Sequence, residues 1–195
     1  MLVTLDSPEA AILSQKTVDF APDEFAVEVE CAAEALLREI QPFLPCAGLA
    51  APQIGINRSI FLYSYNRNPE NLTFAVNPTY IPTSEERQSG WEGCLSVINC
   101  KDCCKLARIP RYEKIKATYF NRTGQRMQFL LEGFAAKVFQ HECDHLAGIV
   151  NIKHPHAEVK SFSTKEEMQQ FIKEVKAKDA DHYQAPQEIK TNSQN

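Results

Sequence analysis

The sequence predicts an α+β fold, in which antiparallel β-sheets surround a central helix that carries an HExxH string, with one helix before it and one after it. Alternating apolar residues over 115–131 predict a β-hairpin, and apolar residues at helical spacing predict helices over 24–40 and 134–147. The 195 residues are 44% hydrophobic and 24% charged, which is typical of a globular domain and excludes wholesale disorder.

The first predicted helix spans residues 24–40. Apolar side chains recur at helical spacing from Phe25 to Ile40, Asp23 is expected to cap the start, and Pro42 is expected to end the helix. The small, glycine-containing segment 46–55 is typical of a loop that leads into a strand over 59–65.

The middle of the chain predicts more strands. Residues 74–78 form a short strand candidate, and 115–131 predict two strands joined by a turn at 121–124. The next segment, 134–147, lacks proline and glycine and is followed by Gly148, which suits a left-handed helix end.

The polar C-terminal part predicts one more helix, docked on the body of the protein. Thr164 and Glu167 can form a capping box at its start. The helix carries an apolar stripe expected to make core contacts: Met168, Phe171, Ile172 and Val175.

Charge and cysteine content exclude several classes of protein. The net charge of −4 argues against binding to specific nucleic acids, and no run of 18 apolar residues exists to span a membrane. The start, MLVTLDSPEA, lacks the basic residues of a secretory or transit signal, so we expect a cytoplasmic protein. Its seven cysteines are therefore expected to stay free for metal binding or reaction.

The string QHECDHLAG (140–148) is the strongest chemical signal. On a helix, His141 and His145 lie one turn apart on the same face, so both imidazoles can bind one metal ion. Glu142 is offset by one residue, where a general base acting on water belongs. A catalytic metal needs a third protein ligand.

Three sources of that ligand are open. One class of metalloprotease requires histidine at position 151, where this chain has Asn151. Other zinc proteases use a downstream glutamate, such as Glu166 or Glu167. The third source is Cys94, upstream in WEGCLSV.

Three blocks together resemble the peptide deformylase family: GLAAPQ (48–53), EGCLS (92–96) and QHECDHL (140–146). The likeness extends from the helix before Cys46 to Ile152. It implies the order of the strands, a deformylase-like catalytic domain over 1–160, and a C-terminal helix with a polar tail over 161–195.

The resemblance also implies a site. Cys94, His141 and His145 would hold one divalent ion and would leave its fourth position to water. The resemblance implies Fe²⁺, which is the usual metal of the family, with Zn²⁺ or Ni²⁺ as alternatives. Glu142 would be the general base, and the Gln53 amide and the Leu95 backbone N–H would bind the oxyanion.

The implied activity is removal of the formyl group from N-formylmethionyl nascent peptides, with transient ribosome association and no membrane partner. Gly48 and Gly93 would border the peptide, because residues without a side chain permit close approach. Phe134 and Val138 would wall an apolar pocket for methionine.

Some positions depart from the family. Cys46 replaces a glycine, Ile98 replaces a proline, and segment 98–111 is longer than usual and carries further cysteines (Cys100, Cys103 and Cys104). Lys137, one turn before His141, faces either substrate carbonyls or solvent. Substrate preference is therefore open, and two alternatives remain: a zinc endopeptidase built on the same helix, and a catalytically silent protein that binds N-termini.

Overall fold

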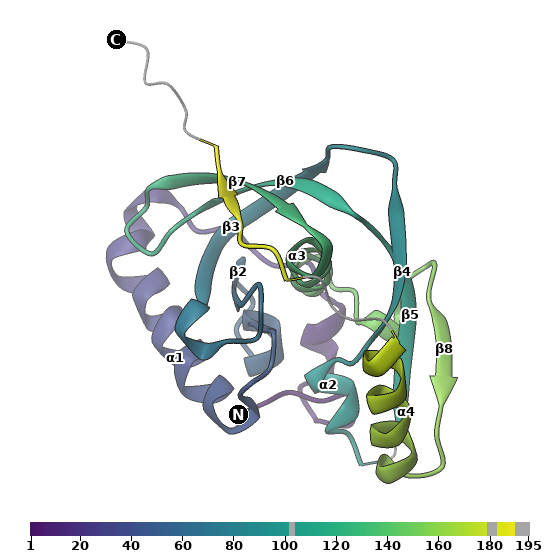
Figure 1. The fold of residues 1–195 in the computed structure, drawn as a ribbon. Helices are drawn as coiled ribbons and strands as arrows, with labels where there is room; N and C mark the ends of the chain where they lie inside the picture. Colours follow the sequence, from purple (N-terminus) through teal and green to yellow (C-terminus); the bar gives the residue numbers. More distant parts are fainter. Residues whose placement is uncertain (102–103, 179–182, 190–195) are drawn as a thin grey trace.

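The computed structural model describes residues 1–101, 104–178 and 183–189, and two antiparallel β-sheets form its framework (Figure 1). Within these ranges, the larger sheet has the strand order β1-β2-β3-β6-β7-β9 and the smaller one the order β4-β5-β8. The strands are β1 (Gly48–Ala50), β2 (Ile60–Tyr63), β3 (Thr73–Pro82), β4 (Arg87–Glu92), β5 (Lys105–Tyr112), β6 (Lys114–Phe120), β7 (Arg126–Glu132), β8 (Glu158–Ser161) and β9 (Gln187–Glu188). The α-helices are α1 (Glu30–Ile40), α2 (Leu95–Ile98), α3 (Gly133–Leu146) and α4 (Lys165–Lys178).

Strand β2 of the six-stranded sheet is buried on both faces, which explains why its sequence is apolar throughout. Phe61 and Tyr63 point to the α3 side, where their rings lie 5.1 and 5.5 Å from that of Phe139. Ile60 and Leu62 point to the other side and join the buried residues of α1. Each such side chain contributes about 1.5–3 kcal/mol to folding by leaving water. The two helices thus cover opposite faces of the sheet.

The first predicted helix exists, but it begins differently. A 3₁₀ turn (Pro22–Glu24) and a π-helical turn (Phe25–Val29) precede α1, and the chain leaves α1 through a 3₁₀ turn that contains Pro42. The expected cap by Asp23 is wrong. The carboxylate of Glu24 accepts the Ala21 N–H at 2.5 Å instead, because it reaches back over the turn.

Segment 46–55 is more ordered than the predicted loop. It forms edge strand β1, which pairs with β2 from Gly48↔Tyr63 to Ala50↔Phe61, and then a 3₁₀ turn (Ala51–Ile54). In the part of the chain that the structure describes, no strand pairs with the outer edge of β1. That edge remains open to an extended ligand.

The predicted hairpin is confirmed. Strands β6 and β7 pair from Lys114↔Glu132 to Phe120↔Arg126, and the side chain of Asn121 organises the turn by accepting the N–H groups of Thr123 and Gln125 at 3.1 and 2.9 Å. The predicted helix over 134–147 is α3, and Gly148 follows it with φ of +76°.

The smaller sheet was not predicted, and α4 docks beside it. Thr164 Oγ1 accepts the Glu167 N–H at 3.1 Å, which is one half of the predicted capping box, but the Glu167 carboxylate accepts the N–H of Ser163 and not that of Thr164. Phe171 on the apolar face of α4 meets the Trp91 ring of β4 edge-on at 5.3 Å. Beyond α4, the chain returns to the larger sheet, where Tyr183 contacts Phe134 and β9 pairs with β7. No helix among the described residues is long and apolar enough to cross a bilayer.

Candidate metal centre and active site

Helix α3 brings two imidazoles together. His141 and His145 lie one turn apart, with ring centroids 5.1 Å from each other. Because α3 packs its other faces on the large sheet through residues such as Phe139, the histidine face has a fixed direction. Burial lowers the pKa of His145, which favours the neutral imidazole that binds metals.

Cys94 completes the cluster. It lies between the end of β4 and the first residue of α2, and its Sγ is 3.3 Å from His145 Nε2. Among the described residues, one thiol and two imidazoles form the group that could hold a metal ion, with donor atoms within 4.8 Å of one another. One divalent ion can contact all three after small side-chain rotations, since metal–sulfur and metal–nitrogen bonds measure about 2.0–2.3 Å.

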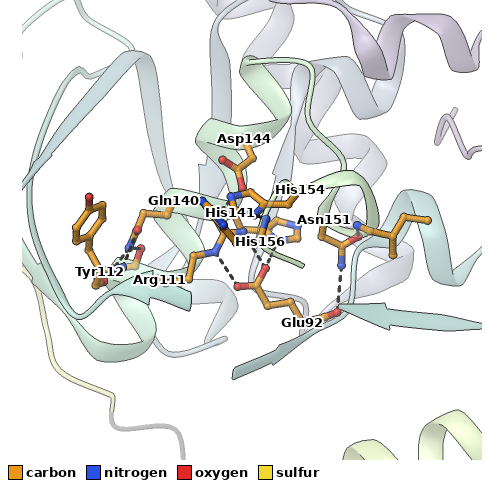
Figure 2. Close-up of polar contacts among 11 residues, drawn as sticks. Glu92, Arg111, Tyr112, Gln140, His141, Asp144, Asn151, His154 and His156 are labelled. Carbon is orange, nitrogen blue, oxygen red and sulfur yellow. Dashed lines mark hydrogen bonds and ion pairs between the residues drawn. The ribbon is translucent and has the colours of Figure 1, made fainter. Parts of the chain in front are cut away.

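A buried ionic network holds His141 in place (Figure 2). His141 Nδ1 lies 2.9 Å from Glu92 Oε2, which leaves Nε2 as the ring atom for a metal. Arg111 donates to both carboxylate oxygens of Glu92 at 2.8 and 2.9 Å and to Asp144 Oδ2 at 2.6 Å. The network ties β4, β5 and α3 together, so the sheet fixes the ring orientation.

The network also sets the charge states. Burial disfavours the carboxylate form of Glu92, but hydrogen bonds from Arg111 and His141 outweigh this effect and lower the pKa of Glu92 to about 2. Burial likewise disfavours a charged His141, yet hydrogen bonds with Cys94 and Glu92 raise its pKa well above the ordinary value. A bound cation would compete with that proton.

Glu142 lies beside the cluster as a buried carboxyl group. It is 3% exposed, and its Oε2 is buried without a hydrogen-bond partner among the described residues. Burial raises the pKa of Glu142 to about 7, near the value that suits a general base. Gly48 makes room for it, because a Cβ at Gly48 would overlap the Glu142 carboxylate.

Gln53 points its amide toward the same place. Its Oε1 accepts the Ala50 N–H at 2.9 Å, and its Nε2 lies 3.1 Å from Ser96 Oγ and 3.7 Å from Cys94 Sγ. The accepted bond fixes which end of the amide faces the cluster. Leu95, the first residue of α2, follows Cys94, and N–H groups in a first helical turn lack intrahelical acceptors.

A cavity of about 300 Å³ opens onto these groups. The four residues expected to border substrate, Gly48, Gly93, Phe134 and Val138, all line it. Sequence reasoning missed other contributors, since Ile172 and Val175 of α4 form part of the wall and Arg111 anchors the network behind it. The apolar stripe of α4 is the sequence signal for this wall, although its spacing alone predicts only contacts with the core.

The alternative ligands are occupied elsewhere. Glu167 accepts the Ser163 N–H at 2.9 Å at the start of α4. Asn151, in place of the metalloprotease histidine, donates to the Glu92 carbonyl at 3.1 Å and so supports β4. Cys46 is half-buried at the cavity, Cys100 is buried, and Cys103 lies outside the described residues.

Comparison with known proteins agrees with this geometry. A family model described as polypeptide deformylase matches residues 2–161. Peptide deformylase 2 of Ralstonia nicotianae is 40% identical over 111 residues, which cover 53% of this chain and 60% of that protein. Peptide deformylase 1 of Prochlorococcus marinus is 32% identical over 160 residues, which cover 76% of this chain and 77% of that protein. The chain spans about 60% of the length of the first curated relatives that it matches.

A solved structure is similar as well. The class I type b peptide deformylase of Acinetobacter baumannii, in a Met-Ala-Ser-bound crystal structure, superposes with a TM-score of 0.67 and 26% identity. The match covers 79% of this chain and 99% of that chain.

Proposed function

Because the chain belongs to the polypeptide deformylase family, we propose that it is a metal-dependent hydrolase that removes the formyl group from N-terminal formylmethionine of newly made polypeptides. The observation that carries the proposal is the meeting of one thiol and two imidazoles beside a buried, unpartnered carboxyl group, at the wall of one cavity. We extend the proposal to a cytoplasmic location and transient association with ribosomes, where such peptides emerge.

Cys94, His141 and His145 would hold the metal, for which we propose Fe²⁺, with Zn²⁺ and Ni²⁺ as substitutes. A dication bound by one thiolate and two imidazoles supplies Lewis acidity that activates water at neutral pH. The Glu92 carboxylate orients His141 by accepting its Nδ1 proton, so that the other ring nitrogen faces the thiol.

Glu142 would move the proton. Its carboxylate takes a proton from the attacking water and delivers it to the departing amine, and its pKa of about 7 suits both transfers. We assign oxyanion binding to the Gln53 side-chain amide and the Leu95 backbone N–H. Loss of one such donor typically costs about 2.7–4 kcal/mol in the transition state.

The peptide would bind in an extended form along the open edge of β1, next to Gly48. Gly93 would permit close approach from the opposite side, and Phe134 and Val138 would contact the first side chain. The Met-Ala-Ser-bound structure of the Acinetobacter baumannii relative supports a methionine-led peptide as the ligand.

We place catalysis in residues 1–160, with the segment 161–195 adding a wall of the cavity through Ile172 and Val175. The C-terminal segment is therefore not an inert tail attached to a complete catalytic domain. It predicts that substrate affinity depends on α4 although the reacting groups do not lie on it.

The test is formate release from formyl-Met-Ala-Ser under anaerobic conditions by protein loaded with iron, nickel or zinc. We expect turnover, and we expect Glu142→Ala to lose at least about 100-fold of it while keeping one bound metal. No formate with any of the three metals would refute the proposal.

Two further outcomes separate the alternatives. A silent binding protein would retain formyl-Met-Ala-Ser without turnover. A zinc endopeptidase would keep stoichiometric metal after Cys94→Ser and would cleave internal peptide bonds. The proposed deformylase should release formate and should lose stoichiometric metal after Cys94→Ser, because Cys94 is one of its three metal ligands.

A further inference from the structure

Strand β4 and helix α3 face each other at two successive levels, and only the first level is paired. At the first level, Glu92 of β4 lies 2.9 Å from His141 of α3. Two residues back on the strand and one turn back on the helix stand Gly90 and Lys137. These positions point to the same side as the first pair, because strand side chains alternate and helix residues four apart share a face.

Lys137 fills the space that a side chain on Gly90 would take. A Cβ added to Gly90 would lie 2.5 Å from Lys137 Nζ and 3.1 Å from its Cε. The ammonium group therefore rests against the bare backbone of β4. Glu92 offers a carboxylate to His141, but Gly90 offers no side chain to Lys137.

Lys137 lacks an internal counter-ion. Throughout the described ranges it forms no ion pair or hydrogen bond, although its side chain is half-buried and lines the cavity. Partly buried charges are normally paired, because each loses hydration that a partner must replace. An ammonium group without an internal partner depends on solvent for its hydration, so a ligand that displaces this solvent must offer it an acceptor.

The rest of the cavity makes an anionic acceptor favourable. The acidic group Glu92 is already bound by Arg111. The other nearby carboxyl group, Glu142, belongs to the proposed proton transfer. Among the described residues that line the cavity, both carboxyl groups thus have other roles, and the ammonium of Lys137 is left without an acceptor.

We propose that Lys137 is a specificity-determining residue, which selects formylmethionyl peptides whose second residue carries a carboxylate. The inference rests on the proposed function, since it concerns the peptide bound in the same cavity. The carboxylate takes the place beside Lys137 that a side chain on Gly90 would otherwise fill. A charge-assisted hydrogen bond of this kind favours glutamate over the isosteric glutamine about tenfold in kcat/KM, mainly through KM.

The experiment compares matched peptide pairs. Formyl-Met-Glu-Ser and formyl-Met-Gln-Ser form the first pair, and formyl-Met-Glu-Ala and formyl-Met-Gln-Ala repeat the comparison with a different third residue. For each pair, kcat/KM is measured by formate release, and the dissociation constant is measured by calorimetry on the metal-loaded protein. The binding measurement keeps the test valid even if turnover is slow.

Four variants isolate the lysine. Lys137→Met removes the charge and should bring the Glu/Gln ratio to about one, whereas Lys137→Arg should keep most of the preference. Gly90→Asp supplies the missing carboxylate and should abolish the preference with the lysine still present. Lys16→Met, at an exposed position away from the cavity, removes an equal charge and should leave the ratio unchanged.

The outcomes are distinct. Equal values for glutamate and glutamine in both pairs, or a preference that survives Lys137→Met, would overturn the inference. Formyl-Met-Ala-Ser is measured alongside: formate release from it without any Glu/Gln preference refutes only the role of Lys137. Absence of release from every peptide refutes the proposed function, and the calorimetric ratio then decides the role of Lys137 alone.

Discussion

Replacing Glu92 with glutamine should weaken both the fold and the metal site. The Glu92 carboxylate accepts two hydrogen bonds from Arg111 and lies 2.9 Å from His141 Nδ1, all within the protein interior. An amide of the same size keeps one acceptor but turns its NH₂ group toward a donor. Breaking a buried ion pair costs about 3–5 kcal/mol, and we expect about 3 kcal/mol because Asp144 still pairs with Arg111.

The same change should lower metal affinity about 10–100-fold, since His141 loses the group that orients its ring. Urea unfolding in the presence of a chelator measures the stability of the metal-free protein, and chelator competition measures the affinity. The matched control is Glu158→Gln, because Glu158 pairs with Arg108 at 3.6 Å on the surface, where both side chains are about half exposed or more (64% and 48%). Such pairs contribute about 0–1 kcal/mol. A Glu92 variant that behaves like the control in both assays would refute the reasoning.

Two substitutions and one labelling experiment test other parts of the structure. Gly48→Ala should reduce formate release about 100-fold and should lower the free energy of unfolding by only about 1 kcal/mol, because the added Cβ would lie 2.9 Å from Glu142 Cδ. Unchanged turnover would contradict this prediction. Gly148→Ala should destabilise the protein by about 2–3 kcal/mol in urea unfolding, since φ is +76° and the Cβ would lie 2.8 Å from backbone atoms; a change below about 0.5 kcal/mol would count against it. Burial, and then the charge of Glu142, raise the pKa of Cys46 to about 11. Mass mapping at pH 8 should therefore find iodoacetamide on exposed Cys31 first, and the rate of Cys46 labelling should still increase toward pH 11. Equal labelling rates for the two cysteines would disprove the assignment.

The local spacing of apolar residues predicts two kinds of element: strands whose side chains alternate in burial, and helices whose apolar side chains lie on one face. Strand β6 alternates half-buried and buried residues along its length, and the hairpin was found for that reason. Helix α3 has glycine at both ends and none inside. Its HExxH spacing identified two donors of the cluster, but the third donor came from a resemblance over three blocks.

The smaller sheet escaped prediction because its strands lack such a pattern. Strand β4 reads RQSGWE, with its buried residues a glycine and a glutamate, and β5 contains Pro110 next to buried Arg111. These polar residues are buried because they pair with one another across strands, which no local rule detects. No local rule therefore predicts the network behind His141, and its sign in the sequence is a charged residue amid apolar neighbours, Arg111.

The position of α4 has a practical consequence for anyone who trims or tags this chain. A polypeptide ending at residue 161, where the family match stops, would retain Cys94, His141 and His145 yet lose Ile172 and Val175 from the cavity wall. We expect such a shortened protein to keep the proposed metal ligands and to bind the peptide more weakly. A fusion partner at the C-terminus would follow β9, the edge strand that pairs with β7, so an affinity tag is better placed at the other end.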